Sequence, residues 1–248
     1  MYIDQYFDGL RAILDTIRRD QDERIRTAGG IVAEAIAAGG IVHIFGSGHS
    51  HMIAEEAFYR AGGLAAVNPI LDERLIFLRG VLESTRAERE TGVAATLLER
   101  ETVLAKDAAV VASNSGINAA PVEMALEMKL RGVRVIAITN IRQSRDSAPR
   151  HTSGKRLFEI ADVAIDNCVP PGDAVVEING TGRAAGPAST VAGAAILNAM
   201  MLEAAAALAA RGQPAPLFPS ANLPDTTEEM LADLLRPYKT RVRYIDVK

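Results

Sequence analysis

The chain has 248 residues, with 27 Lys and Arg against 31 Asp and Glu, one cysteine and 48% hydrophobic residues. A net charge of −4 gives no overall basic footprint for nucleic acid, and the lone Cys168 excludes an intrachain disulfide framework and a cysteine-based zinc site. The first residues carry charges and aromatic rings where a signal peptide needs an apolar stretch. We therefore expect a soluble, cytoplasmic protein with no membrane or nucleic-acid partner.

Residues 1–38 are predicted to be helical because their apolar residues recur at helical spacing, and Gly39-Gly40 ends this segment. The β-branched run at residues 41–45 that follows is typical of a strand buried on both faces of a sheet. Further strands are predicted at residues 65–67, 108–112, 133–138 and 163–165, and helices between them at 50–61, 93–104, 119–131 and 154–160. This alternation predicts parallel βαβ units and an α/β fold in three layers, an αβα sandwich.

The segment Val191–Ala210 is twenty residues long and carries one charge, Glu203. Its length fits a membrane span, but ten of its residues are alanine, which favours helix and the close approach of neighbouring backbones. We interpret it as a buried helix in a soluble core or a subunit interface.

No internal repeat or long linker divides the chain, so a single domain over residues 1–248 is the simplest organisation. It comprises an N-terminal helical segment at 1–38, a core at 39–211 and a C-terminal tail at 212–248. In the remaining stretches, a short strand is expected at 175–178 and a helix at 226–235, and the run 242–247 has no assigned structure.

Two loops of small polar residues each follow a predicted buried strand and lead into a helix. They are Gly46-Ser47-Gly48-His49-Ser50-His51 and Ser113-Asn114-Ser115-Gly116-Ile117-Asn118. Free N–H groups and the positive dipole end of a helix make such a place an anion site. Because ligands of parallel sheets bind beyond the carboxyl ends of the strands, the two loops predict one phosphorylated ligand held from two sides. For either loop alone, ordinary turns and helix caps are the alternative.

Two stretches of the sequence match a nucleotide-binding motif only in part. The pattern Gly46-x-Gly48-x-x-His51 has histidine where the dinucleotide fingerprint needs its third glycine, and Asp72 lies beyond the expected end of the second strand. Gly154-Lys155-Arg156 lacks the hydroxyl that follows lysine in a Walker A loop. A dinucleotide oxidoreductase therefore stays a minor alternative, and we expect no cofactor.

Together the Gly-Ser-Gly-x-Ser loop at 46–50, the Ser-Asn-Ser-Gly loop at 113–116 and the pair Thr139-Asn140 resemble the sugar isomerase (SIS) domain. The resemblance covers residues 30–210, and the stretches 46–52 and 151–157 resemble a stand-alone bacterial protein of a phosphosugar isomerase-like subgroup. It implies a flavodoxin-like fold with a five-stranded parallel sheet and a small phosphosugar whose phosphate binds at residues 113–118. It also implies a homodimer or homotetramer with sites at subunit boundaries.

Aldose–ketose isomerisation needs a base that moves a proton between C1 and C2 and an acid that opens the sugar ring. Glu56 and Glu55, one turn after the first loop, are the candidate bases, and the alternative is that both are solvated or paired. His51 and Glu55 share a helix face. His49, His51 and Glu55 form a weak alternative metal set, although no metal is expected.

Three further residues outside the two loops are candidates. His151 and Lys155 lie in the polar segment 142–156 and could bring an acid and a charge clamp to the ligand, whereas the arginines there are expected to be solvated. Glu203 is either catalytic or bonded to a partner, because a buried carboxylate is costly otherwise. His43, inside the first strand, is expected to be a core residue.

At the start of the alanine-rich helix, Ser189 and Thr190 could cap the helix or contact the sugar.

The sequence thus predicts a phosphosugar-binding protein that isomerises its ligand through a cis-enediol. A sensor without chemistry, a lyase and an epimerase remain open, because the SIS family includes isomerases, a sugar-phosphate ether lyase and sensor domains.

Overall fold

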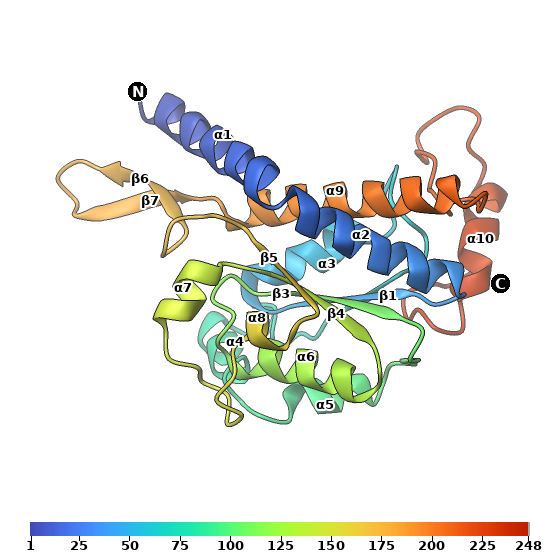
Figure 1. Ribbon diagram of the computed structural model, residues 1–248, viewed down its shortest axis with the longest axis horizontal. Helices are drawn as coiled ribbons and strands as arrows, with labels where there is room; N and C mark the ends of the chain where they lie inside the picture. The colour runs from blue at the N-terminus through green and yellow to red at the C-terminus, as the bar shows by residue number, and fades with distance from the viewer. Residues whose placement is uncertain (248) are drawn as a thin grey trace.

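A computed structural model describes residues 1–247 of the chain. Its centre is a five-stranded parallel sheet with the strand order β2-β1-β3-β4-β5 (Figure 1), which confirms the expected flavodoxin-like αβα sandwich. The order of the strands reverses between β1 and β3, so the crevice for a ligand lies at the carboxyl ends of these two strands. The strands are β1 (Val42–Gly46), β2 (Val67–Ile70), β3 (Ala108–Ala112), β4 (Arg134–Thr139) and β5 (Val163–Asp166).

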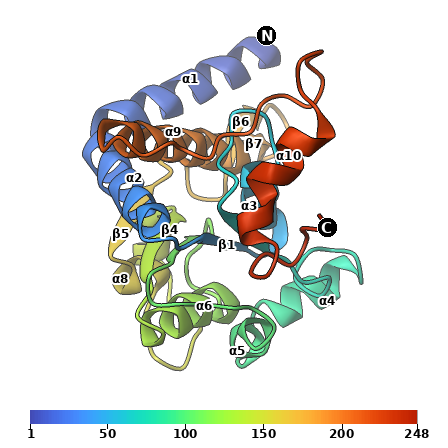
Figure 2. The same ribbon diagram turned by 90° about the vertical axis from the view of Figure 1, so that its right-hand side faces the viewer.

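Helices cover both faces of the sheet, as the end-on view of Figure 2 shows. One face is covered by α2 (Asp22–Ala37), α3 (His51–Ala57) and α9 (Ser189–Ala210). The other is covered by α4 (Val81–Ala87), α5 (Val93–Leu98), α6 (Ala119–Leu130) and α8 (Leu157–Ile160). Because α3 and α6 follow adjacent strands and lie on opposite faces, the loops before them diverge and leave the crevice between them.

The remaining elements lie around this sandwich. The first helix, α1 (Tyr2–Asp20), extends past the sheet beside an antiparallel hairpin of β6 (Ala174–Ile178) and β7 (Arg183–Pro187). The short helix α7 (Ile141–Asp146) follows β4, and α10 (Glu228–Leu235) lies at the opposite end of the molecule with the C-terminal tail. The carboxyl edge of the sheet therefore faces the side of α7, and its amino edge faces the tail.

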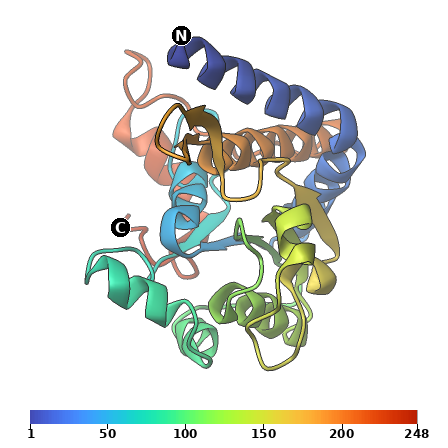
Figure 3. The same cartoon turned by 90° about the vertical axis from the view of Figure 1, so that its left-hand side faces the viewer.

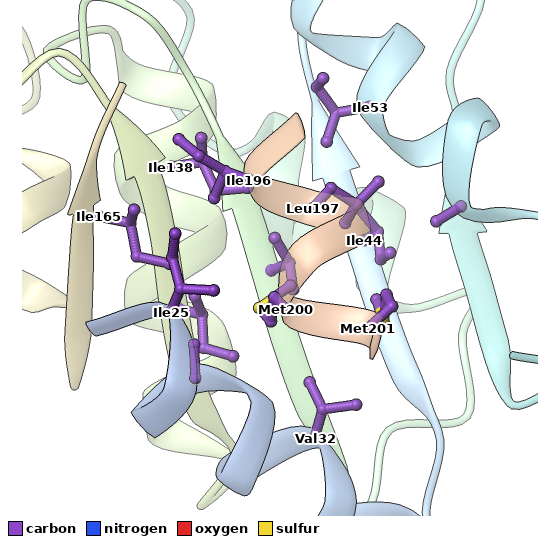
Figure 4. Close-up of a cluster of buried hydrophobic side chains, with 14 of the residues drawn as sticks. Ile25, Val32, Ile44, Ile53, Ile138, Ile165, Ile196, Leu197, Met200 and Met201 are labelled. Carbon is purple, nitrogen blue, oxygen red and sulfur yellow. The ribbon is translucent and has the colours of Figure 1, made fainter. Parts of the chain in front are cut away.

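The core between the sheet and α2 and α9 is aliphatic. Ile196 and Met200 of α9 lie in one buried cluster with Val32 of α2 and Ile44 of β1 (Figure 4). The two helices approach closely at Gly29, where an added Cβ would lie 2.7 Å from the Cβ of Glu203. Within residues 1–247, α9 alone is long and apolar enough to cross a membrane, and half of its apolar stretch is buried in this core.

Several expected elements differ in their bounds. The N-terminal segment is two helices, because Gln21 has non-helical backbone angles and separates them. The second strand begins at Val67 and not at residue 65. The helix expected at 154–160 forms only from Leu157, because Gly154 has a φ of +68° and its neighbours form a turn.

Other helices are shorter than expected, and some elements were missed. The stretch 50–61 is helical only to Ala57 and 93–104 only to Leu98. The elements α4, α7 and β7 were not expected, and residues 242–247 form no strand. In that tail Val242 is buried against the apolar amino end of the sheet.

Candidate functional site

The first loop is held tightly at the end of β1. A Cβ at Gly46 would overlap the carbonyl of Ser50, so only glycine allows this turn. The N–H of Gly48 donates to the carbonyl oxygen of Leu75 at 2.8 Å, and the ring of His49 lies 4.9 Å from that of Phe77. The segment that follows β2 therefore covers the first loop.

The second loop turns its carbonyls into the protein and leaves its N–H groups free. The carbonyl oxygens of Asn114, Gly116 and Ile117 accept hydrogen bonds from Asn140, Leu157 and Arg150. Within the part of the chain that the structure describes, the N–H groups of the loop residues Ser115, Ile117 and Asn118 donate to no protein acceptor. Consecutive free N–H groups before a helix form a concave site for an anion.

Gly116 gives the second loop this shape. It has a φ of +62°, and an added Cβ would lie 2.6 Å from Oγ1 of Thr139. Its N–H donates to Oγ of Ser113 at 3.2 Å, which ties the two ends of the turn together. Asn118 has the extended backbone of a helix N-cap and leads into α6.

The two loops meet in one narrow cleft at the switch point, on the side of the molecule that faces the viewer in Figure 3. Its polar lining joins residues of both loops to the end of β5 and the start of α9: His49, Ser50, Ser113, Asn114, Asn167, Ser189 and Thr190. About 20 Å³ of it is open to water, which is room for about one molecule. A sugar can enter only if the loops part or if it lies over the mouth.

Asn167, which the sequence analysis did not single out, ties the end of β5 to the second loop. Its amide Nδ2 donates to Oδ1 of Asn114 at 2.8 Å, and the side chain is buried. The signal for it is its position, since it is a polar residue directly after a buried strand. At the start of α9, Ser189 Oγ donates to Asp173 at 2.7 Å, so this serine is bound to a capping carboxylate.

The structure places the two candidate bases beside the cleft and not in its lining. Glu56 pairs with Arg60 and accepts a hydrogen bond from Asn198 at 2.9 Å. The side chain of Glu55 is 51% exposed, and its Oε2 lies 3.5 Å from Nε2 of His51. This matches the alternative in which both carboxylates are paired or solvated.

The segment after α7 packs on the second loop through a residue that was expected to be solvated. Arg150 donates from Nη1 to Oδ1 of Asn118 at 2.7 Å. His151 instead lies 2.9 Å from Oγ of Ser153, and Lys155 is exposed. Within one chain, Arg150 therefore brings a cation to the second loop, and His151 and Lys155 do not line the cleft.

Glu203 lies far from the cleft. It pairs with Arg26 of α2 at 3.0 Å and its side chain is 35% exposed. It follows Ser189 by fourteen residues of one helix, which is about 21 Å at 1.5 Å per residue. Within its own chain Glu203 therefore lies outside the cleft and is bonded to Arg26, and a catalytic role for it stays a prediction.

The structure does not bring the weak alternative metal set His49, His51 and Glu55 together as a metal site. Across residues 1–247, no group of three His, Cys, Asp or Glu side chains could hold a metal ion. His49 stacks on Phe77, while His51 is bound through Nδ1 to the carbonyl of Gly48.

One carboxylate that the sequence analysis missed contacts the first loop. Glu88, at the end of α4, accepts a hydrogen bond from Oγ of Ser47 at 2.8 Å. Its carbonyl oxygen accepts from the N–H of Ala120 in the first turn of α6, at 2.9 Å. No motif marks it, because forty-one residues separate it from Ser47.

A second polar cluster lies at the amino edge of the sheet. Asp107, which is buried, accepts hydrogen bonds from Nε2 of His43 at 3.2 Å, from Nη2 of Arg241 at 2.5 Å and from the backbone N–H groups of Ile41 and Leu104. Burial alone would raise the pKa of Asp107, but these four donors hold that pKa well below its ordinary value. His43 is thus a core residue, as expected.

Comparison with known proteins gives consistent results. A profile of the SIS domain matches residues 5–140. The chain is 38% identical to the UPF0309 protein of Geobacillus thermodenitrificans over 240 residues. This alignment covers 97% of this chain and 96% of that protein. It is 41% identical over 238 residues to the UPF0309 protein of Brucella anthropi, with 96% of each covered.

Solved structures show the same fold at low sequence identity. The phosphoheptose isomerase GmhA of Neisseria gonorrhoeae superposes with a TM-score of 0.53 at 15% identity, over 80% of this chain and 94% of that one. The Vibrio vulnificus NanR protein, complexed with ManNAc-6P, superposes with a TM-score of 0.53 at 13% identity, over 86% of this chain and 65% of that one.

Proposed function

Because the chain belongs to the SIS domain family, we propose that it binds a phosphorylated sugar at the carboxyl edge of its sheet. The observation that carries this proposal is the set of free N–H groups in the loop Ser113–Asn118. Phosphate is the anion that such a loop suits. The hydroxyl of Ser115 and the guanidinium of Arg150 supply further donors there, since Arg150 contacts Asn118.

Sugar hydroxyls would then lie in the cleft between the two loops. His49 and Ser50 of the first loop, with Asn114 and Asn167, offer donors and acceptors along its walls. Solved structures of this fold include an isomerase and a protein in complex with a sugar phosphate. We propose aldose–ketose isomerisation through an enediol as the reaction. A sugar-phosphate sensor without chemistry is the alternative, and a lyase or epimerase would use the same proton abstraction.

We propose that the protein is a cytoplasmic homo-oligomer in which all residues act as one SIS domain. The outer face of α9 supports an assembly, because Val191 and Leu202 there are 40% and 70% exposed. At the free end of α1, Ile3 and Phe7 are 68% and 59% exposed. A homodimer or homotetramer would cover these side chains, and sites at subunit boundaries would give the half-buried His151 and the exposed Lys155 a ligand in a neighbouring copy.

Thermal unfolding against aldose, ketose and amino-sugar phosphates tests the binding proposal, with NAD and NADP as controls. A ligand at one hundred times its Kd adds about 2.7 kcal/mol, and at roughly 2–4 °C per kcal/mol this raises Tm by about 5–10 °C. We expect the rise with one class of phosphosugar, and we expect Ser115→Ala to reduce it.

Ser220→Ala is the matched control, because Ser220 lies in the C-terminal tail at the other end of the molecule. It should leave the ligand-induced rise unchanged. A rise with NAD alone, or a rise with phosphosugar that Ser115→Ala and Ser220→Ala leave equally intact, would contradict this site.

A further inference from the structure

We propose that Glu88 is the acid–base residue of this site and moves a proton between C1 and C2 of the bound sugar. The inference rests on the proposed phosphosugar binding and assigns the base to a residue outside both loops. It replaces Glu55 and Glu56 in that role. Three features of Glu88 support it: its position, its lack of a cation, and a free carboxylate oxygen.

Glu88 links the first loop to the helix that follows the second loop. Its backbone is bonded to Ala120 in the first turn of α6, which the second loop leads into, and its carboxylate is bonded to Ser47 of the first loop. Throughout residues 1–247, no other carboxylate is hydrogen-bonded to a serine of either loop. A sugar whose phosphate occupies the second loop would extend toward this carboxylate.

No cation neutralises Glu88. In the described part of the chain, no Lys, Arg or His nitrogen lies within 4.0 Å of its carboxylate. By contrast, Glu56 is paired with Arg60, and Asp72 with Arg74 at 2.9 Å. A carboxylate in an ion pair gives up that attraction when it takes a proton, so a carboxylate bonded only to a neutral hydroxyl is the better base.

The second oxygen of Glu88 is available for the substrate. Ser47 donates to Oε1 and, among the residues described, Oε2 has no hydrogen-bond partner. The side chain of Ser47 is buried, with 4% of the residue exposed, so it fixes the orientation of the carboxylate. Fixed orientation of a general base toward one atom lowers the entropic cost of the transfer.

The proton transfer balances without any further reactant. Oε2 takes the proton from C2 of the open-chain aldose, the C2–H electron pair becomes the C1=C2 double bond, and the carbonyl pair moves to O1, which takes a proton from water. The enediol then loses the proton of its O2 hydroxyl to water as C2=O forms, and C1 takes its proton back from Glu88. The product is the ketose, and the carboxylate is regenerated.

The test uses full-length protein and the phosphosugar that raises Tm most strongly. Exchange of the C2 proton with D2O, followed by NMR, measures proton abstraction, and the rise in Tm measures binding. We expect Glu88→Gln to keep the rise in Tm and to lose exchange by about 100-fold or more, the usual contribution of a general base. Glu90→Gln, at an exposed carboxylate two residues away, is the matched control and should keep exchange within a few-fold.

Each outcome is decisive. Exchange retained by Glu88→Gln, or lost equally in Glu90→Gln, would overturn the assignment, and so would a wild-type protein that binds a phosphosugar without exchanging its proton. If no phosphosugar raises Tm, the proposed function itself fails. Should Glu88→Gln not fold, Glu88→Asp keeps the charge but withdraws it by one methylene, and it should lower exchange at least about tenfold while binding persists.

Discussion

The two edges of the central sheet use the same kinds of side chain in opposite ways. At the amino edge, the buried carboxylate of Asp107 accepts four hydrogen bonds, two of them from His43 and Arg241. At the carboxyl edge, among the residues described, the second loop keeps N–H groups without acceptors, and the carboxylate of Glu88 accepts one hydrogen bond. The comparison teaches that residue type does not separate structural from functional polar groups. The number of donors at the carboxylate differs between the two regions: Asp107 is saturated by four donors, whereas Glu88 has one and keeps acceptor capacity for a ligand.

The largest expected effect is at the amino edge. Asp107→Ala would leave Arg241 and His43 buried without their carboxylate, and breaking a buried pair in this way costs about 3–5 kcal/mol. Urea unfolding would measure the loss, with the exposed Asp233→Ala as control. The ligand-induced rise in Tm should persist in the folded variant. If the folded variant lost that rise, the cluster at the amino edge would also contribute to ligand binding at the carboxyl edge.

The same cluster predicts a dependence of stability on pH. Because the pKa of Asp107 is held below its ordinary value in the folded chain, its contribution to the free energy of unfolding is present above the unfolded pKa of about 3.9. That contribution is lost as the pH falls below this value and Asp107 takes up a proton. Unfolding of wild type and Asp107→Asn at several acidic pH values should show a shallower fall in the variant. Parallel curves would mean that Asp107 does not carry the effect.

A smaller effect is expected at the carboxyl edge. Gly116→Ala places a side chain at a φ of +62° and 2.6 Å from Oγ1 of Thr139, which costs about 1–3 kcal/mol. It should also abolish the rise in Tm with phosphosugar, because the N–H groups of the loop would turn away. Gly30→Ala, where an added Cβ meets no atom within 4 Å, is the control. If Gly116→Ala kept the rise in Tm with phosphosugar, the phosphate would not bind at this loop.

The smallest effect is expected away from both edges. Glu203→Gln removes a partly exposed pair with Arg26 and should change stability by less than about 1 kcal/mol. Turnover should not change if each site is built from one chain. If turnover fell while binding and stability were kept, Glu203 would belong to the site of a neighbouring subunit. The site would then not be built from the carboxyl edge of one chain alone.

The sequence was sufficient for the parts of the fold that local patterns determine. Four of the five strands follow from short runs of β-branched and small apolar residues, as in Ala108–Ala112, and the two loops follow from glycine and serine directly after such runs. The strand β2 shares only Val67 with the run expected at 65–67, because Asn68 and Pro69 lack a strand pattern. The hairpin strand Arg183–Pro187 could not be predicted, because its residues have no strand pattern and it forms by pairing with β6.

The details of the site depend on contacts between distant residues. Glu88 reaches Ser47 across forty-one positions, and Arg241 reaches Asp107 across 134. No spacing rule covers such distances. The sequence also did not predict where the side chains of one segment point: Arg150 contacts the second loop, whereas His151 is bonded to Ser153.

The close contact of α2 with α9 at Gly29 has a consequence for biosynthesis. One of these helices emerges early from the ribosome and the other only when more than 200 residues have been made. Until then, the face of the sheet that carries α2 and α3 lacks the cover of α9, although its valines and isoleucines are buried in the finished protein. Such distant pairing makes folding slow. The nascent chain therefore carries an exposed apolar surface through most of translation, which makes it a natural client for ribosome-associated chaperones.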